Sequence, residues 1–156
     1  MLTRGTFNET ISWSPPDGTG LLVEFTKLIE LLLVEDNAGD VRLLQEAIRG
    51  SGVRVSLHIA RNGLEAIRYL GREGDYEREP RPDLILLDIH LPVRDGVDVL
   101  SDISANPDWN TIPVVILTGD RVDPNITERF GHIVRTTAKK PVHPEELRRI
   151  LDLVPR

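Results

Sequence analysis

A run of four aliphatic residues that ends in a single carboxylate places the strongest constraint on the fold. Residues 84–87 are Leu-Ile-Leu-Leu, and Asp88 follows them. An aliphatic run without polar alternation is typical of a strand that is buried on both faces. Residues 89–96 include Pro, Asp and Gly and predict a loop. Asp88 is therefore expected at the carboxyl end of a central parallel strand, where open α/β sheets bind their ligands.

Strand and helix patterns alternate along the rest of the chain. Strands are expected at residues 28–34, 54–60, 83–88, 112–117 and 133–138, and helices at residues 38–49, 62–70, 96–105, 123–130 and 143–154. Five strands that alternate with five helices predict an α/β domain, with a parallel sheet covered on both faces. The polar alternation of residues 54–60 indicates a strand at the sheet edge.

The bulk properties exclude several classes of protein. A net charge of −6 argues against non-specific binding of nucleic acid, and the lack of cysteine excludes disulfides and thiolate chemistry. The start of the chain lacks the pattern of a signal peptide, and no apolar run is long enough to cross a bilayer. We expect a cytoplasmic protein without a membrane association. Residues 1–27 are expected to form a flexible N-terminal extension, and residues 28–156 the folded domain.

Polar side chains follow four of the expected strands. Glu35 and Asp36 follow the first, Asp88 ends the third, Thr118 follows the fourth and Lys140 lies just after the fifth. In a parallel sheet these strand ends share one rim. Three carboxylates there would repel one another without a cation, and Mg²⁺ prefers such oxygen ligands. One carboxylate could attack phosphorus and form an acyl phosphate, and a lysine suits a phosphate oxygen.

Four short motifs carry a resemblance to a known family. They are Leu-Val-Glu-Asp-Asn at 33–37, Leu-Asp-Ile-His-Leu-Pro-Val-Arg-Asp-Gly at 87–96, Leu-Thr-Gly at 117–119 and Lys-Pro at 140–141. Together they resemble the receiver domain of two-component response regulators, over roughly residues 28–153. Residues 33–44 and the charged segment 71–82 resemble the stand-alone receivers associated with phytochromes. The resemblance implies a flavodoxin-like, doubly wound sheet of strand order 2-1-3-4-5.

The resemblance also implies roles for individual residues. Asp88 would accept a phosphoryl group, and Mg²⁺ would be held by Glu35, Asp36, Asp88 and the backbone carbonyl of His90. Thr118 and Lys140 would contact the phosphoryl group. The peptide bond between Lys140 and the proline after it is expected to be cis. Such a protein would not be an enzyme, beyond at most slow self-dephosphorylation.

The partners that the resemblance implies are proteins. A histidine kinase or phosphotransfer protein would supply the phosphoryl group. Phosphorylation would act through a downstream protein partner or a phosphorelay, and a homodimer is a further possibility. Neither nucleic acid nor membrane is expected as a partner.

Two departures from the family pattern leave an alternative function open. Thr137 stands where the family usually has Tyr or Phe, and Gly119 stands where Ala or Ser is commoner. The alternative is a binding module with the receiver fold that has lost the phosphorylation switch. An aspartyl-phosphate phosphatase is disfavoured. Such enzymes carry an Asp-x-Asp nucleophile motif after the first strand, whereas here Glu35 and Asp36 follow that strand. His58 is expected to be a surface residue, and Asp40 a surface or capping acid.

Overall fold

The computed structural model of the chain describes residues 7–11 and 27–155. The strands are β1 (Phe7–Ile11), β2 (Ile29–Val34), β3 (Val55–Ala60), β4 (Leu84–Asp88), β5 (Val114–Thr118) and β6 (Val134–Lys139). The helices are α2 (Ala38–Ser51), α3 (Gly63–Leu70), α4 (Gly96–Ala105), α5 (Pro124–Arg129) and α6 (Pro144–Leu151), with a 3-10 turn η1 (Gly74–Tyr76). None of the helices in these described ranges is long and apolar enough to cross a membrane.

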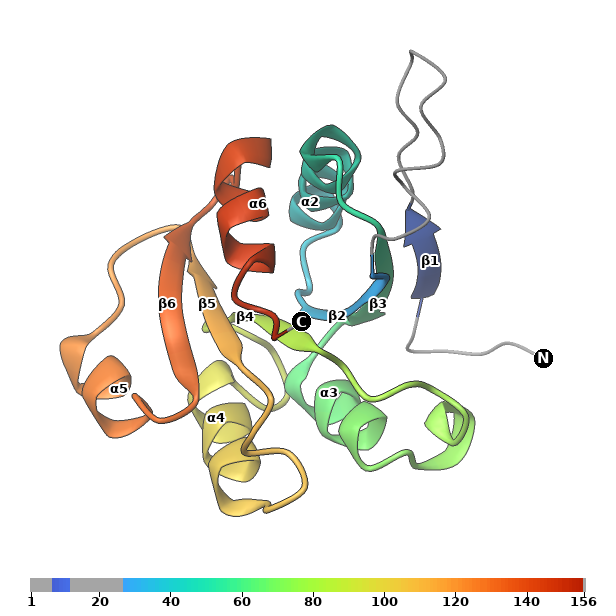
Figure 1. The fold of residues 1–156 in the computed structure, drawn as a ribbon. Coiled ribbons are helices and arrows are strands. Elements are labelled where there is room, and N and C mark those ends of the chain that lie inside the picture. The colour runs from blue at the N-terminus through green and yellow to red at the C-terminus, as the bar shows by residue number, and fades with distance from the viewer. Residues whose placement is uncertain (1–6, 12–26, 156) are drawn as a thin grey trace, which may run out of the picture.

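The strands form one sheet in the order β1-β3-β2-β4-β5-β6 (Figure 1). The five strands from β2 to β6 are parallel, and in chain order they are arranged 2-1-3-4-5. This arrangement confirms the predicted doubly wound, flavodoxin-like fold. β1 is an addition to it and runs antiparallel to β3.

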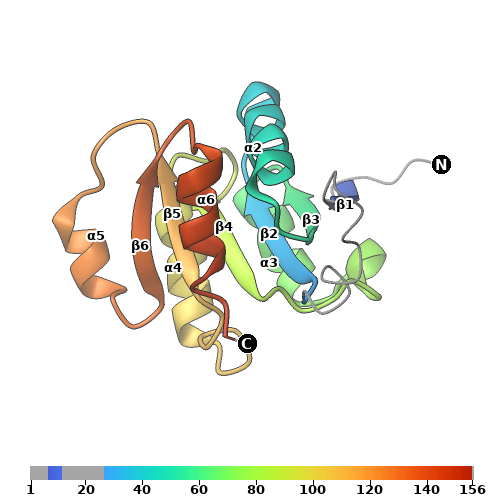
Figure 2. The same ribbon diagram turned by 45° about the horizontal axis from the view of Figure 1, so that its top comes forward.

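Helices cover both faces of the sheet, as the aliphatic strands require. α2 and α6 pack on one face, and α3, α4 and α5 lie on the other (Figures 1 and 2). The central strands β4 and β5 are buried at every position. Because alternate residues of a strand point to opposite faces, each central strand contributes side chains to both cores.

Local sequence fixes where the helices begin. The side chains of Asn37, Asn62, Asp95 and Asp123 each accept a hydrogen bond from a backbone N–H in the first turn of the helix that follows. These short polar side chains are favoured caps because the first N–H groups of a helix lack partners within it. All four caps lie in loops that follow the carboxyl ends of strands, so they also fix the loops at that rim.

The N-terminal part of the chain differs from the sequence expectation. Residues 7–11 form a strand in register with β3, with Phe7 opposite Ile59 and Ile11 opposite Val55. Residues 1–6 and 12–26, the rest of the expected flexible extension, lie outside the described residues. The division into an extension and a domain from residue 28 stays a prediction. β3 is not the edge strand that its polar alternation indicated, because β1 pairs along its outer side.

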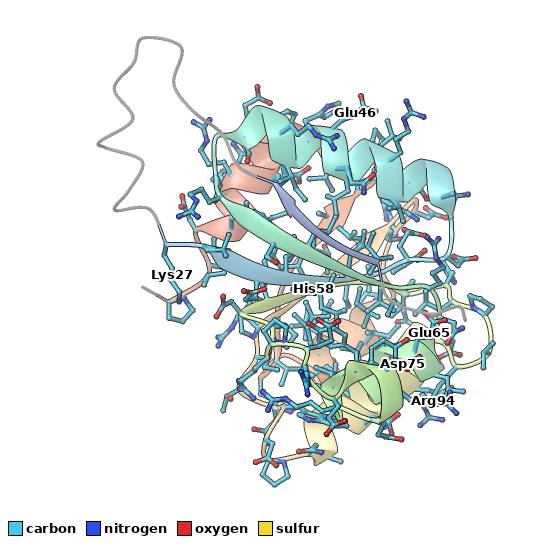
Figure 3. The ribbon with its side chains drawn as sticks, turned by 90° about the vertical axis from the view of Figure 1, so that its right-hand side faces the viewer. Lys27, Glu46, His58, Glu65, Asp75 and Arg94 are labelled. Atoms are coloured by element: carbon cyan, nitrogen blue, oxygen red, sulfur yellow. The ribbon has the colours of Figure 1, made fainter. Side chains whose placement is uncertain are left out.

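His58 is buried rather than at the surface. Its side chain is 1% exposed, and its Nε2 lies 2.8 Å from Glu30 Oε1 while Nδ1 lies 3.5 Å from Glu79 Oε2. Seen from the β1 side, it lies within the sheet layer, with α2 on one side and α3 on the other (Figure 3). The expectation was wrong because the polar face of β3 packs against Tyr69 of α3 and the loop that carries Glu79.

Candidate functional site

An acidic cluster lies at the carboxyl ends of β2 and β4. Carboxylate oxygens of Glu35, Asp36 and Asp88 all lie within 4.8 Å of one another. The two segments are more than fifty residues apart in the chain, and the parallel pairing of β2 with β4 brings them together. The prediction that these three residues converge at one rim is therefore confirmed.

Lys140, just after the end of β6, contacts the carboxylates of the cluster. Its Nζ donates to Glu35 Oε1 at 3.0 Å, to Asp40 Oδ2 at 2.9 Å and to Asp88 Oδ2 at 3.2 Å. The Lys140–Pro141 peptide bond is cis, as predicted. The backbone N–H of Lys140 donates to the carbonyl of Thr118 at 2.7 Å, so β5 and the lysine are tied together at this rim.

Burial gives the cluster unusual electrostatics. Glu35 and Asp88 are only 1% and 4% exposed. The pKa of Glu35 is raised to about 7, chiefly by burial and then by the neighbouring Asp88, while Lys140 opposes the shift. Burial alone would lower the pKa of Lys140, but its hydrogen bonds to Asp40 and Glu35 raise it above its ordinary value. A further cation at this cluster would lower the pKa of Glu35 and favour its ionised form at neutral pH.

The loop from β4 to α4 is shaped around Asp88. The backbone N–H of His90 donates to Asp88 Oδ1 at 2.9 Å, while the His90 side chain is exposed. A Cβ at Gly96 would lie 2.6 Å from the Cα of Ile89, so only glycine fits where the loop returns to the helix. Val93 adopts a positive φ of 67° and is 76% exposed. A β-branched residue in this conformation is strained, and such strain is often found beside functional groups.

Thr118 lies on the strand next to Asp88. It ends β5, is 4% exposed, and its Oγ accepts a hydrogen bond from the backbone N–H of Asp120 at 3.0 Å. Thr137 lies on β6 and is exposed. A cavity of about 360 Å³ borders both threonines. A Cβ at Gly119 would meet no atom within 4 Å, so the loop after Thr118 is loosely packed.

Asp40 is a member of the cluster that sequence reasoning missed. It lies in the first turn of α2, where an acid is explained by the helix dipole alone. Its Oδ2 lies 2.9 Å from Lys140 Nζ, the shortest of the three carboxylate contacts of that lysine. No local pattern signalled this contact, because Asp40 and Lys140 lie one hundred residues apart in the chain.

The fold, together with the acidic cluster and Lys140 at the carboxyl rim of the sheet, is typical of one protein family, and the sequence matches the model of that family. Residues 31–152 match the response regulator receiver domain family, and the chain belongs to that family. It is a receiver domain of two-component signalling. Among its relatives, Response regulator Rcp1 of Synechocystis sp. is 51% identical over 88 residues, which span 56% of this chain and 60% of Rcp1. The probable methanogenesis regulatory protein FilR2 of Methanothrix harundinacea is 34% identical over 123 residues, 78% of each chain.

Solved structures agree with the sequence matches. The Mn²⁺-bound form of Rcp1 aligns with a TM-score of 0.66 and 38% identity, over 81% of this chain and 91% of that one. The phosphorylated cyanobacterial phytochrome response regulator RcpA aligns with a TM-score of 0.68 and 38% identity, over 82% and 91%. The expected likeness to the phytochrome-associated receivers is thus confirmed.

Proposed function

We propose that the chain is a single-domain response regulator that accepts a phosphoryl group on Asp88. The observation that carries the proposal is the contact of Lys140 Nζ with Asp88, Glu35 and Asp40 at the carboxyl rim of the sheet. An ammonium group beside a buried carboxylate suits a phosphoryl group that arrives there. The phosphorylated state of RcpA supports the same reading for this chain.

The acidic cluster fits a divalent metal ion. Its donors are carboxylate oxygens, which hard ions such as Mg²⁺ prefer. The pKa of Glu35 is raised because its carboxylate is buried beside Asp88, and a bound cation would stabilise the charged form. We assign Glu35, Asp36, Asp88 and the backbone carbonyl of His90 as the residues that would hold Mg²⁺. When bound, the ion would neutralise charge on the transferring phosphoryl oxygens. The Mn²⁺-bound form of Rcp1 supports this assignment.

Each residue then has a defined part in the transfer. A carboxylate oxygen of Asp88 attacks phosphorus in a phosphohistidine, the P–N bond breaks with its electron pair on nitrogen, and an acyl phosphate forms. The leaving imidazole takes a proton. Lys140 would pair with a phosphoryl oxygen, and the Thr118 hydroxyl would donate to another. The chain is therefore proposed to be a phosphoacceptor without turnover of its own, apart from slow hydrolysis of the acyl phosphate.

Phosphorylation by a small phosphodonor tests the assignment. With acetyl phosphate and Mg²⁺, we expect the wild type to gain one phosphoryl group and Asp88→Asn to gain none. Asp108→Asn is the matched control, because Asp108 is an exposed aspartate outside the acidic cluster. Labelling that persists in Asp88→Asn, or a loss in Asp108→Asn equal to that in Asp88→Asn, would contradict the proposal.

The proposed output is a change in protein–protein contact. A histidine kinase or a phosphotransfer protein would be the donor, and a downstream protein, a phosphorelay or a second copy of the chain would read the phosphorylated state. Size-exclusion chromatography with and without beryllofluoride and Mg²⁺ tests the last of these. A shift to a dimer that Asp88→Asn abolishes is the result expected of a homodimer, and an unchanged elution volume would contradict it.

A further inference from the structure

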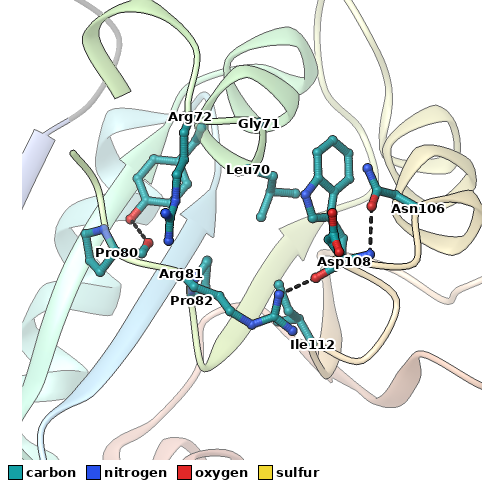
Figure 4. Close-up of a pocket in the computed structure, with 11 residues that line it drawn as sticks. Leu70, Gly71, Arg72, Pro80, Arg81, Pro82, Asn106, Asp108 and Ile112 are labelled. Atoms are coloured by element: carbon teal, nitrogen blue, oxygen red, sulfur yellow. Dashed lines mark hydrogen bonds between the residues drawn. The ribbon is translucent and has the colours of Figure 1, made fainter. Parts of the chain in front are cut away.

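A second concave site lies at the opposite rim of the sheet from Asp88. A cavity of about 520 Å³ is enclosed by the end of α3, by residues 80–82 before β4, and by the turn between α4 and β5 (Figure 4). This volume is within the range typical of small-molecule sites. Because Pro82 precedes β4 and Ile112 precedes β5, the cavity lies at the amino ends of the strands that carry Asp88 and Thr118 at their carboxyl ends.

Two sets of hydrogen bonds connect the walls of the cavity to one another. The Tyr69 hydroxyl donates to the backbone carbonyl of Pro80 at 2.9 Å. The Arg81 guanidinium donates to the backbone carbonyl of Asp108 and, at 2.8 Å, to Thr111 Oγ1. Figure 4 shows Arg81 reaching across to the Asp108 turn. The cavity is thus formed before any ligand arrives.

Arg72 adopts a costly backbone conformation at the edge of this cavity. Its φ is +54°, in the left-handed region that favours glycine, whereas its neighbour Gly71 has an ordinary φ of −80°. A glycine would adopt this φ without strain, so an arginine at position 72 carries an energetic cost. Among the described residues, the structure gives the Arg72 guanidinium no hydrogen bond or ion pair, so its five donors are available to a ligand.

The remaining lining sets the chemistry of that ligand. Leu70, Pro82, Trp109 and Ile112 provide apolar contact area. The carboxylate of Asp108 also borders the cavity and would repel a second negative charge. We propose that the cavity binds a small molecule with a planar apolar body and one carboxylate, which pairs with Arg72. This inference is independent of the phosphoacceptor function proposed for the other rim.

Binding of 2-naphthoate tests the proposal, with uncharged 2-naphthamide as the matched probe. By ¹H–¹⁵N NMR on the full chain, we expect 2-naphthoate to shift the backbone amides of residues 69–72, 106 and 108–112 but not those near Asp88. We expect it to bind about tenfold more tightly than the amide, the typical scale of one charge-assisted hydrogen bond. Equal affinity of the two probes, or shifts confined to other residues, would overturn the proposal.

Variants of two arginines in one loop separate the specific role of Arg72 from general charge. Arg72→Gln should lose most of the preference for 2-naphthoate, since only Arg81 then remains as a cation in the lining. Arg78→Gln should behave as the wild type, because Arg78 is exposed and does not line the cavity. Arg72→Gly should raise the thermal midpoint through relief of the positive φ and still lose the preference for 2-naphthoate. A preference that survives in Arg72→Gly, or an equal loss in Arg78→Gln, would refute the role of Arg72.

Discussion

The two rims of the sheet are built on different principles. At the carboxyl rim, Glu35, Asp88 and Lys140 lie at or just after the ends of strands, so the pairing of the strands brings the two carboxylates within hydrogen-bond distance of the lysine. At the amino rim, the connections of residues 71–83 and 106–113 meet, and the cavity exists because Arg81 and Tyr69 hold the backbones of these connections in place. The order of the strands determines which functional groups meet at the carboxyl rim. The shape of a cavity between loops depends on individual side-chain contacts.

The largest expected effect concerns the packing that supports the carboxyl rim. A Cβ at Gly63 would lie 1.9 Å from the backbone oxygen of Arg94, so α3 and the loop after Asp88 would have to separate. We expect Gly63→Ala to lower the free energy of unfolding by about 3 kcal/mol in urea denaturation. Gly119→Ala is the control at the same rim, because its Cβ would meet no atom within 4 Å, and we expect a change within about 0.5 kcal/mol. Equal effects would show that this rim is not tightly packed.

The second prediction concerns charge at the carboxyl rim. The folded pKa of Glu35 is raised to about 7, from an ordinary value of 4.5, so its ionisation costs stability progressively from about pH 4.5 to pH 7. In metal-free buffer at pH 8, Glu35→Gln should therefore raise the free energy of unfolding by about 2 kcal/mol.

The pH and metal dependence supply the controls for Glu35→Gln. Below about pH 4 the difference from the wild type should vanish, because the carboxyl is then protonated in both states. Saturating Mg²⁺ should stabilise the wild type more than the variant, since the variant lacks one carboxylate ligand. A variant that is less stable than the wild type in metal-free buffer at pH 8 would contradict the assigned electrostatics.

The third prediction tests strain beside Asp88. Val93 is exposed with a φ of +67°, and Val93→Gly should raise the free energy of unfolding by about 1 kcal/mol through relief of that strain. Val93→Thr keeps a β-branched side chain and should give no gain. Chemical denaturation of both variants makes the comparison, and an equal gain in Val93→Thr would show that backbone strain is not the cause.

The smallest expected effect concerns the amino rim. Tyr69→Phe removes the hydrogen bond to the Pro80 carbonyl and should lower the free energy of unfolding by roughly 0.5–1 kcal/mol. It should leave the rate of phosphorylation by acetyl phosphate unchanged, because the bond lies at the far end of β4 from Asp88. A slower phosphorylation at an unchanged fold would show that the two rims are coupled, contrary to the comparison above.

Sequence patterns predicted most of the fold for identifiable reasons. Unbroken aliphatic runs mark buried parallel strands, and the caps Asn62 and Asp123 mark helix starts, so the five strands and the helices between them were predictable from the pattern. The order of the strands was implied by the family resemblance and not by the pattern. The convergence of Glu35, Asp36 and Asp88 was predictable because the strand ends share a rim.

The errors arose where distant segments determine the environment of a residue. The alternation of β3 was interpreted as an exposed edge, but β1 pairs with it and Glu30 and Glu79 surround His58. Asp40 has an adequate local explanation as a helix-start acid, so its contact with Lys140, one hundred residues away in the chain, could not be seen in the sequence.

Chemical mapping of the phosphorylated residue tests the central claim most directly. After reaction with acetyl phosphate and Mg²⁺, reduction with borohydride converts an acyl-phosphorylated aspartate to homoserine, which peptide mass spectrometry can locate. The account predicts homoserine at position 88 alone, and none when Mg²⁺ is removed by chelation. Homoserine at Asp36, Asp95 or another aspartate in place of Asp88, or its complete absence in the presence of Mg²⁺, would contradict the account.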